Sequence, residues 1–365
     1  MDAINPSAAR TEALAGRLLS ALNGGALTMM ISIGHRTGLF DAMADSGPRT
    51  SSQLAEAAGL DERYVREWLG AMLTGGIVEH DPSRGTYRLP KAHAACLTRD
   101  AGSDNLAALS QYIGLLGSVE DRIIDCFRNG GGVPYSEFPR FHEVMAEDSG
   151  MTVLPALTDA ILPLVPGLLA DLERGIDVLD VGCGSARALV LMARTFPNSR
   201  FRGYDVSMEG LSRGRHEAAQ AGLTNLELVQ QDAATFQDAN RYDLITAFDA
   251  IHDQAHPRRV LANIARALRP AGVFLMQDIG ASSHQHENCE HPLGTLLYTI
   301  SCMHCMTVSL AYGGEGLGAM WGEEKARELL AEAGFRNVEV HRLEHDLQNH
   351  YYVNKLSRTR VAFGG

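Results

Sequence analysis

Two short stretches of the chain hold the residue types best suited to chemistry. The first is HENCEHPLGTLLYTISCMHC, residues 286–305, which contains three of the six cysteines and three histidines. Cys302 and Cys305 have CxxC spacing, so a zinc site is one interpretation, completed by Cys289 and a histidine from position 286, 291 or 304. Buried free thiols that pack as small hydrophobic groups are another.

The residues around this cysteine pair favour a helix over a zinc knuckle. Thiol pairs in knuckles usually lie in turn-rich loops, whereas residues 293–310, LGTLLYTISCMHCMTVSL, form one long apolar run. Helical spacing predicts one face shared by four side chains: Tyr298, Ser301, Cys302 and Cys305. We therefore expect no metal in this stretch.

The second stretch is AFDAIHDQAHP, residues 247–257. His252 has the residue type of a general base, because an imidazole with a pKa near 6.5 can take a proton from a hydroxyl group. Two alternatives stay open: His252 is only a polar residue at the start of a helix, or His256 is the reactive histidine. A thiol acceptor would need little base, since thiolate forms readily near neutral pH.

The elements that must position these residues follow a regular pattern from Ile176 onward. Short apolar strands alternate with amphipathic helices, which is typical of a doubly wound, mainly parallel sheet. The pattern predicts seven strands, within residues 176–182, 200–207, 226–233, 242–253, 272–279, 337–343 and 350–356. His252 then follows the fourth strand, at the edge of the sheet where ligands bind in such folds.

A glycine pair follows the first of these strands. The segment VLDVGCGSAR places Gly182 and Gly184 between an apolar strand and a helix, where a tight turn lets the backbone approach a ligand closely. Asp205 closes the second strand, where an acid can bind ribose hydroxyls. Arg187 occupies the place of the third glycine in a dinucleotide fingerprint, which argues against a nicotinamide cofactor.

These motifs resemble those of class I S-adenosylmethionine-dependent methyltransferases. The likeness runs through D-x-G-x-G at residues 180–184, Asp205, QDA at 231–233 and LRPAGVFLM at 268–276. It implies S-adenosylmethionine as the cofactor, with Asp232 at the adenine amino group and Ala233 beside the ring. The residues that it assigns to cofactor binding are Asp180, Gly182, Cys183, Gly184, Asp205, Val206, Asp232, Ala233 and Phe248.

The N-terminal part predicts a winged helix-turn-helix. QLAEAAGL, residues 53–60, reads as a helix that Thr50, Ser51 or Ser52 can cap and that Gly59 ends. Residues 61–74 read as a second helix, and GIVEHDPSRGTYRL, residues 76–89, as a hairpin. Such a module followed by this methyltransferase pattern resembles the caffeic acid O-methyltransferase group and related bacterial and nematode small-molecule methyltransferases. That likeness implies a homodimer formed through the N-terminal domain, each subunit helping to close its partner's pocket.

The resemblance divides the chain and assigns the chemistry. It implies a winged-helix dimerisation domain over residues 1–105, a helical linker over 106–175, and a Rossmann-like methyltransferase domain over 176–365 with an acceptor-pocket insertion at 279–322. His252 and Asp253 match the HD of the plant HDW motif, so His252 is the expected base. The expected acceptor-binding residues are Asp249, His256, Tyr298, His304, Cys305 and Trp321.

The expected function is methyl transfer to the oxygen or sulfur of a small molecule. A different class of function is a winged-helix transcriptional regulator whose second domain only senses a ligand, and a less favoured one is a sulfide- or metalloid-specific methyltransferase. The second helix of the winged-helix module carries Asp61, Glu62 and Glu67 against two arginines, which argues against DNA binding.

Bulk composition narrows the partners and the compartment. The formal net charge is −12, so we expect neither nucleic acid nor an acidic membrane surface as a partner. Residues 152–172 are apolar but contain Asp159 and three prolines, which argues against a membrane span. The first residues show no signal-peptide pattern, and six cysteines do not form a disulfide framework, so the cytoplasm is the expected location.

Overall fold

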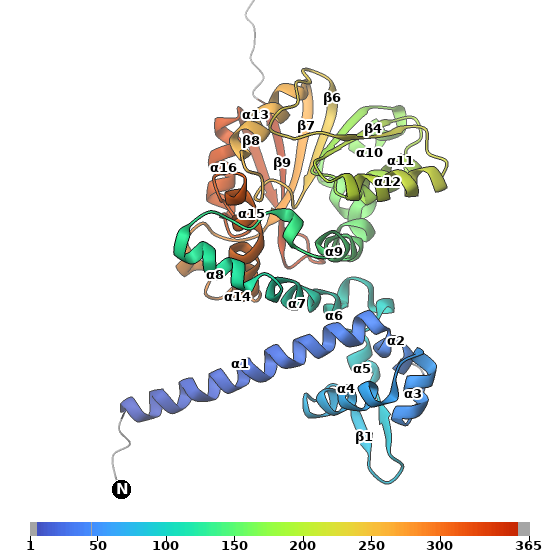
Figure 1. Ribbon diagram of the computed structural model, residues 1–365. Coiled ribbons are helices and arrows are strands. Elements are labelled where there is room, and N and C mark those ends of the chain that lie inside the picture. Colours follow the sequence, from blue (N-terminus) through green and yellow to red (C-terminus); the bar gives the residue numbers. More distant parts are fainter. Residues whose placement is uncertain (1–5, 45, 357–365) are drawn as a thin grey trace, which may run out of the picture. The chain divides into compact units, whose positions relative to one another are not determined.

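A computed structural model describes residues 6–44 and 46–356 and divides the chain into two compact units, Met1–Gly117 and Ser118–Gly365. The first five residues, where we expect no signal peptide, lie outside the described residues. Figure 1 labels the elements of both units. Because the units are separate bodies, each is described by itself.

The first unit is the expected winged helix. Its elements are α1 (Pro6–Thr37), α2 (Leu39–Met43), α3 (Ser51–Ala58), α4 (Glu62–Thr74), β1 (Glu79–Asp81), β2 (Thr86–Arg88), α5 (Lys91–Ala94), a 3₁₀ turn (Arg99–Asp104), α6 (Leu106–Leu109) and α7 (Gln111–Gly117). Thr50 and Gln53 form a reciprocal capping box at the start of α3. Gly59, in the left-handed conformation, ends that helix, and the carboxylate of Asp61 caps α4.

Trp68 is the centre of this unit's core. Its indole stands edge-on to Phe40 with ring centroids 5.2 Å apart, and its Nε1 donates to the Met30 carbonyl of α1 at 2.8 Å. A Cβ on Gly34 would come within 2.6 Å of the same indole, so only glycine lets α1 approach this closely. The earlier turns of α1 have no such cover within the unit, and Leu14, Leu18 and Leu22 are more than half exposed.

The second unit contains the expected seven-stranded sheet, in the order β5-β4-β3-β6-β7-β9-β8 (Figure 1). The strands are β3 (Asp177–Val181), β4 (Arg200–Asp205), β5 (Leu226–Gln230), β6 (Tyr242–Phe248), β7 (Leu268–Ile279), β8 (Phe335–His341) and β9 (Asn349–Leu356). The first five run parallel, and β9 pairs antiparallel with both β7 and β8. The strand order reverses between β3 and β6, which makes the carboxyl ends of these strands the expected ligand crevice.

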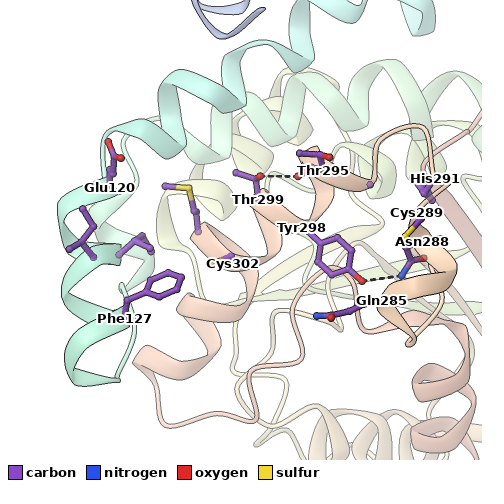
Figure 2. A pocket seen from close by; sticks show the side chains of 14 residues that line it. Glu120, Phe127, Gln285, Asn288, Cys289, His291, Thr295, Tyr298, Thr299 and Cys302 are labelled. Carbon is purple, nitrogen blue, oxygen red and sulfur yellow. Dashed lines mark hydrogen bonds between the residues drawn. The ribbon is translucent and has the colours of Figure 1, made fainter. Parts of the chain in front are cut away.

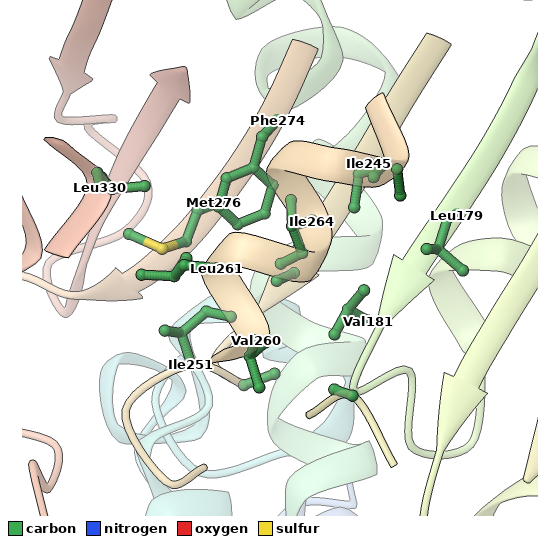
Figure 3. Packing of buried hydrophobic residues seen from close by; sticks show 14 of the residues in the cluster. Leu179, Val181, Ile245, Ile251, Val260, Leu261, Ile264, Phe274, Met276 and Leu330 are labelled. Carbon is green, nitrogen blue, oxygen red and sulfur yellow. The ribbon is translucent and has the colours of Figure 1, made fainter. Parts of the chain in front are cut away.

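Both faces of the sheet are covered, which is why its strands read as continuous apolar runs. Along β7, Val273 and Leu275 belong to one buried cluster while Phe274 and Met276 belong to the other. Figure 3 shows the second cluster, where Val260, Leu261 and Ile264 of α13 pack on the sheet. The helices that flank the sheet are α10 (Leu168–Arg174), α11 (Arg187–Thr195), α12 (Met208–Gln220), α13 (Pro257–Ala267) and α16 (Gly322–Glu332).

Two further helical segments belong to this unit. One contains α8 (Glu120–Asn129), a 3₁₀ turn (Tyr135–Glu137), α9 (Phe141–Ala156), a π-helical turn (Leu157–Ile161) and a 3₁₀ turn (Leu162–Leu164). The other, between β7 and α16, contains a 3₁₀ turn (Gln285–Asn288), α14 (Gly294–Ile300), a π-helical turn (Ser301–Cys305) and α15 (Met306–Ala311). The apolar run of residues 293–310 is therefore helical, as expected.

Among the residues that the structure describes, two helices are long and apolar enough to cross a membrane by length and composition alone, Ser7–Thr37 and Gly294–Ala311. The second has buried side chains within its own unit, among them His304 and Cys305. A third apolar segment is a pair of helical stretches, Phe141–Leu164 and Leu168–Arg174, which are apolar enough only when taken together. The two stretches meet at a bend of 105°. Residues 152–172 therefore do not form one straight span.

Candidate active site

The turn after β3 brings two glycines to the carboxyl edge of the sheet. Gly182 and Gly184 both have positive φ, 75° and 54°, which explains why glycine occupies these positions. A Cβ on Gly182 would lie 2.5 Å from the Cβ of Ala250, so this turn packs against the loop that carries His252. A Cβ on Gly184 would meet no atom within 4 Å, so the turn is open on that side.

Asp205, the last residue of β4, is held with its carboxylate at this turn. The backbone N–H of Gly184 donates to Oδ2 and that of Ser207 donates to Oδ1, each at 2.7 Å. The next residue, Val206, is 64 % exposed, which is unusual for a valine at a strand end. A carboxylate beside an exposed apolar side chain fits a nucleoside, whose hydroxyls would bind Asp205 while its ring covers Val206.

The other motif residues lie beneath or beside this edge. Asp180 is buried and accepts a hydrogen bond from Thr246 Oγ1 at 2.7 Å, so it lies under the turn. Burial raises the pKa of Asp180 to about 7 although the Thr246 bond opposes the shift. Burial also raises the pKa of the Cys183 thiol well above its usual range. Arg187, at the third glycine position, donates to the Ala146 carbonyl of α9 at 2.6 Å.

The remaining expected cofactor residues follow β5 and end β6. Asp232 is exposed, and its Oδ1 accepts from the Ala234 backbone N–H at 2.8 Å. Ala233 is buried, with its carbonyl accepting from Asn263 of α13. Phe248 is the last residue of β6 and half-buried. The edge thus offers the mixture of glycine turn, carboxylates and apolar side chains that an adenosyl group requires.

His252 is paired with a carboxylate that sequence reasoning missed. Its Nδ1 lies 2.7 Å from Oδ1 of Asp278, and both side chains are buried. The same oxygen accepts from the Ile279 backbone N–H at 2.8 Å and from Trp321 Nε1 at 2.9 Å. Trp321 thus holds Asp278 in place. Asp278 is the penultimate residue of β7, next to β6, and that position at the carboxyl edge was the signal that could have found it.

The surroundings of His252 favour its protonated form. Burial alone would lower its pKa, but the charge of Asp278, helped by Cys305, outweighs burial and raises the pKa of His252 well above 6.5. Because Nδ1 faces Asp278, the other ring nitrogen is the one that can exchange a proton with a substrate, and the Cys305 thiol lies close to the same ring. His256 lies directly before α13 and takes no part in this pairing.

Asp249 lies beside the pair, in a loop conformation that is rare for non-glycine residues. Its φ is +49°, and its Oδ2 accepts from Gln277 Nε2 at 3.0 Å. One ligating atom each of Asp249, His252 and Asp278 lie within 4.8 Å of one another. Burial, then the neighbouring Asp278, raise the pKa of Asp249 well above its usual range.

His304 and Cys305 belong to the buried side of the π-helical turn. The His304 imidazole stacks on Phe141 with ring centroids 3.5 Å apart, and Tyr135 and Phe138 stand edge-on to it. Neither ring nitrogen has a hydrogen-bond partner among the described residues. Burial and the nearby His252 lower the pKa of His304 well below its usual range, so it is neutral at physiological pH. The Cys305 thiol is within hydrogen-bonding reach of His252.

Tyr298 and Cys302, unlike His304 and Cys305, lie at a groove on the surface of the second unit. They line an open groove of about 710 Å³ between α14 and α8, together with Phe127 (Figure 2). Tyr298 accepts there from Asn288 Nδ2 at 3.0 Å. The prediction that Tyr298, Ser301, Cys302 and Cys305 share one face is therefore wrong. The π-helical turn at Ser301–Cys305 contains more residues per turn than an α-helix, so it rotates Ser301 and Cys305 away from the groove.

The cysteines of residues 286–305 do not converge on one point. Cys289 is exposed, Cys302 lines the groove and Cys305 is buried. Within residues 6–44 and 46–356, the one set of three or more metal-ligating side chains that comes together is Asp249, His252 and Asp278. The geometry therefore gives no support to the zinc interpretation of the CxxC pair.

Two protein families match the chain, one within each of the two units Met1–Gly117 and Ser118–Gly365. Residues 25–99 match the Rv2258c-like winged HTH domain, and residues 172–334 match a methyltransferase domain. Among curated proteins, a fatty-acid O-methyltransferase of Mycolicibacterium smegmatis is 37 % identical over 113 residues, which are 30 % of this chain and 39 % of that protein. A phthiotriol/phenolphthiotriol dimycocerosates methyltransferase of Mycobacterium tuberculosis is 32 % identical over 108 residues, 29 % of this chain and 38 % of that protein.

The chain thus spans about two fifths of the length of these curated relatives. Solved structures match almost the whole fold at low identity. A putative O-methyltransferase of Nostoc punctiforme has a TM-score of 0.70 at 18 % identity, covering 93 % of this chain and 98 % of that one. Human N-acetylserotonin methyltransferase, solved with S-adenosylmethionine, has a TM-score of 0.67 at 17 % identity, covering 98 % and 100 %. At these identities the likeness concerns the fold.

Proposed function

Because the chain belongs to the class I S-adenosylmethionine-dependent methyltransferases that carry an N-terminal winged helix-turn-helix domain, we propose that it methylates a hydroxyl oxygen of a small molecule. The observation that carries the proposal is the buried pair of His252 and Asp278 beside the glycine turn. That pair supplies what oxygen methylation needs from the protein, a base that is held in one orientation.

The residues at the carboxyl edge of the sheet fit S-adenosylmethionine. The open side of Gly184 admits the ligand, Asp205 is positioned for ribose hydroxyls, and Val206 and Asp232 would contact adenine. When bound, S-adenosylmethionine supplies an electrophilic methyl group on a sulfonium, and the chain need only align the acceptor with it.

His252 then accepts the proton of the acceptor hydroxyl. In its neutral form His252 would accept the hydroxyl proton of the acceptor at the ring nitrogen that faces away from Asp278, as the acceptor oxygen takes the methyl group that S-adenosylmethionine would supply. Asp278 stabilises the resulting imidazolium and, with Trp321 and the Ile279 N–H fixing its carboxylate, holds the ring orientation. The proton leaves to solvent after the product departs.

Oxygen is preferred to sulfur because of this base. A thiol ionises near neutral pH and needs little help, whereas an alcohol or phenol does not ionise there. One of the curated relatives named above carries the name fatty-acid O-methyltransferase, which reports methylation at oxygen and supports the same preference. Their matched segments cover less than a third of this chain, so the acceptor is identified by the experiment below.

We also propose that the protein is a homodimer formed through its first unit. Leu14, Leu18 and Leu22 follow one another at four-residue spacing along α1 and are more than half exposed. A second copy is the occupant that agrees with the two-domain family. DNA binding is not favoured, because Arg63 and Arg66 of α4 are each paired with a glutamate of the same helix, Glu67 and Glu62.

The test is transfer of a labelled methyl group from S-adenosylmethionine to a panel of phenols, aliphatic alcohols, carboxylic acids and thiols. We expect labelled product with a hydroxyl acceptor, and loss of that product with His252→Gln while S-adenosylhomocysteine still binds. Label found only in thioether products, or no transfer together with sequence-specific DNA binding, would overturn the proposal.

A further inference from the structure

We propose that Asp249 is a positioning residue: it carries a proton on Oδ1 and donates it to Oδ2 of Asp278, so that Asp278 meets His252 as a carboxylate satisfied on both oxygens. The inference rests on the proposed function of His252. It adds a third member to the pair, one that the matching of sequence motifs does not assign.

Two orphaned oxygen atoms lead to this inference. Asp249 Oδ1 and Asp278 Oδ2 are shut off from solvent and have no hydrogen-bond partner among the described residues. Their partner oxygens are occupied, Asp249 Oδ2 by Gln277 and Asp278 Oδ1 by three donors. One ligating atom of Asp249 lies within 4.8 Å of one of Asp278. Buried carboxylate oxygens without donors are costly, and one proton held between these two carboxyl groups would satisfy both.

Burial and charge decide which group carries the proton. Asp278 has three donors on one oxygen, including His252 Nδ1, and this favours its ionised form. Asp249 has one neutral amide donor from Gln277 and lies beside the charge of Asp278. The proton therefore belongs on Asp249.

The backbone at Asp249 supports a role in the site. Its φ of +49° places it in the left-handed region, which costs about 1 kcal/mol for a residue other than glycine. The loop starts directly after β6 and reaches His252 three residues later. Strained backbone persists where surrounding contacts fix it, and it is frequent at active sites.

A divalent cation is the competing explanation for this cluster, and the donor geometry disfavours it. Nδ1 of His252 is 2.7 Å from Asp278 Oδ1, a hydrogen-bond distance that requires a proton on one of the two atoms. Oδ1 also accepts from Ile279 and Trp321. A cation would need Nδ1 without its proton, which breaks this arrangement.

Other ionisable groups also face the cluster, and several of their charges act on the pKa values of Asp249 and His252. They come from α9, β4, the loop after β6, the π-helical turn, the loop before β9, and β9 itself: Asp148, Asp205, Asp253, His304, Cys305, Asp346 and Tyr351. All are common to the variants below, so differences between variants report on Asp249.

The experiment compares Asp249→Asn with Asp249→Gly. Asn keeps the shape of the protonated acid, offers an N–H to Asp278 and tolerates a positive φ; Gly removes the group and relieves the backbone. Without the donor, Asp278 binds the imidazolium more tightly, so the pKa of His252 rises in the Gly variant. In Asp249→Gly we expect the pKa of His252 to rise by about one unit, which lowers the neutral fraction of His252 roughly tenfold. In Asp249→Asn we expect that pKa to change by less than about 0.3.

The pKa of His252 is measured by NMR of the labelled imidazole in the full chain with S-adenosylhomocysteine, so the result does not depend on turnover. A clear fall of that pKa in Asp249→Asn would show that Asp249 is ionised in the wild type and would overturn the proposal. Binding of Mg²⁺, Mn²⁺ or Zn²⁺ that Asp249→Asn abolishes would overturn it as well, in favour of a cation site.

A second readout is the infrared carbonyl band of a protonated carboxylic acid, recorded near pH 8. At that pH Asp180 and Asp253, whose pKa values are about 7 and about 6, are largely ionised. We expect a protonated-acid band that Asp249→Asn removes and Asp180→Asn leaves. Its absence in the wild type would contradict the proposal. If these readouts hold but no hydroxyl acceptor is methylated, the proposed function fails while the carboxyl pair stands.

Discussion

The imidazole of His252 and the carboxylate of Asp278 meet at 2.7 Å, with the histidine supplied by the loop after β6 and the acid by the end of the neighbouring strand β7. The two residues are 26 positions apart in the sequence. Parallel pairing of the two strands brings them to one edge, where the glycine turn after β3 also lies. The base is therefore oriented by the sheet itself.

Replacing Asp278 by Asn should cost turnover without costing cofactor affinity. The amide is isosteric but removes the charge that stabilises the imidazolium, and it can hold the ring in the wrong tautomer. We expect kcat/KM to fall roughly 10²- to 10⁴-fold. Calorimetric titration with S-adenosylhomocysteine should give a Kd within about threefold of the wild type, and a parallel loss of affinity would mean that the site has unfolded.

The pH dependence should reveal the state of His252. Asp278 raises the pKa of His252 above 6.5, and a base acts only when neutral, so kcat/KM for a hydroxyl acceptor should rise with pH through a limb above 6.5. In Asp278→Asn the limb should move to lower pH, because the largest charge that opposes the effect of burial on the pKa of His252 is removed. A rate that falls over this range would indicate that the imidazolium binds an acceptor that is already anionic, such as a carboxylate.

Gly184→Ala tests the cofactor cradle. The added Cβ enters open space in the chain itself, so a loss of affinity would report on the ligand. We expect S-adenosylhomocysteine to bind at least about tenfold more weakly, equivalent to about 1.4 kcal/mol. Gly85→Ala is the matched control, since Gly85 also has a positive φ and nothing within 4 Å but lies in the β1–β2 hairpin. Equal affinity in both variants would contradict the assigned site.

Asp180→Asn should stabilise the protein near neutral pH. The pKa of Asp180 is about 7 in the folded chain and 3.8 in the unfolded chain, so the unfolded chain loses this proton at lower pH. The folded state is therefore destabilised relative to the unfolded state as the pH rises from 3.8 to 7. Asn keeps an acceptor for Thr246 and removes that loss, on the order of 1 to 3 kcal/mol. Urea unfolding at pH 5 and pH 7.5 should show a larger gain at the higher pH; equal gains would refute the buried acid.

Leu18→Arg should break the dimer. Leu18 is 57 % exposed on α1, and a charge in an apolar interface is strongly unfavourable. Sedimentation should show a dimer for the wild type and a monomer for the variant, with Leu347→Arg, 79 % exposed in the second unit, remaining dimeric. A monomeric wild type that binds lipid vesicles through α1 would instead favour a membrane role for this helix.

The strand–helix alternation and the glycine turn could be predicted from the sequence because both follow from local patterns. β7 reads as an apolar strand since it is covered on both faces, and positive φ at Gly182 and Gly184 explains their residue type. His252 could be placed at the carboxyl edge for the same reason. The place of Asp278 near the end of a strand indicated the same edge, but its pairing with His252 depends on which strands are neighbours, and that is not a local property of the sequence.

The acceptor side was harder to predict because helical periodicity failed there. The π-helical turn at Ser301–Cys305 changes the phase of the helix, so His304 and Cys305 face the interior while Tyr298 and Cys302 line the outer groove. The aromatic residues around His304 come from residues 135–141, more than 150 positions earlier. The sequence carries no spacing that connects these two segments.

The central claim, that His252 removes a proton from an acceptor hydroxyl, is tested most directly by varying the acidity of that hydroxyl. Methyl transfer to a series of ring-substituted phenols should be compared for the wild type and His252→Gln. If His252 is the base, the defect of the variant should be largest, at least about 10²-fold, for the least acidic phenol and should shrink as the phenol becomes more acidic. A defect of the same size across the series would contradict the account.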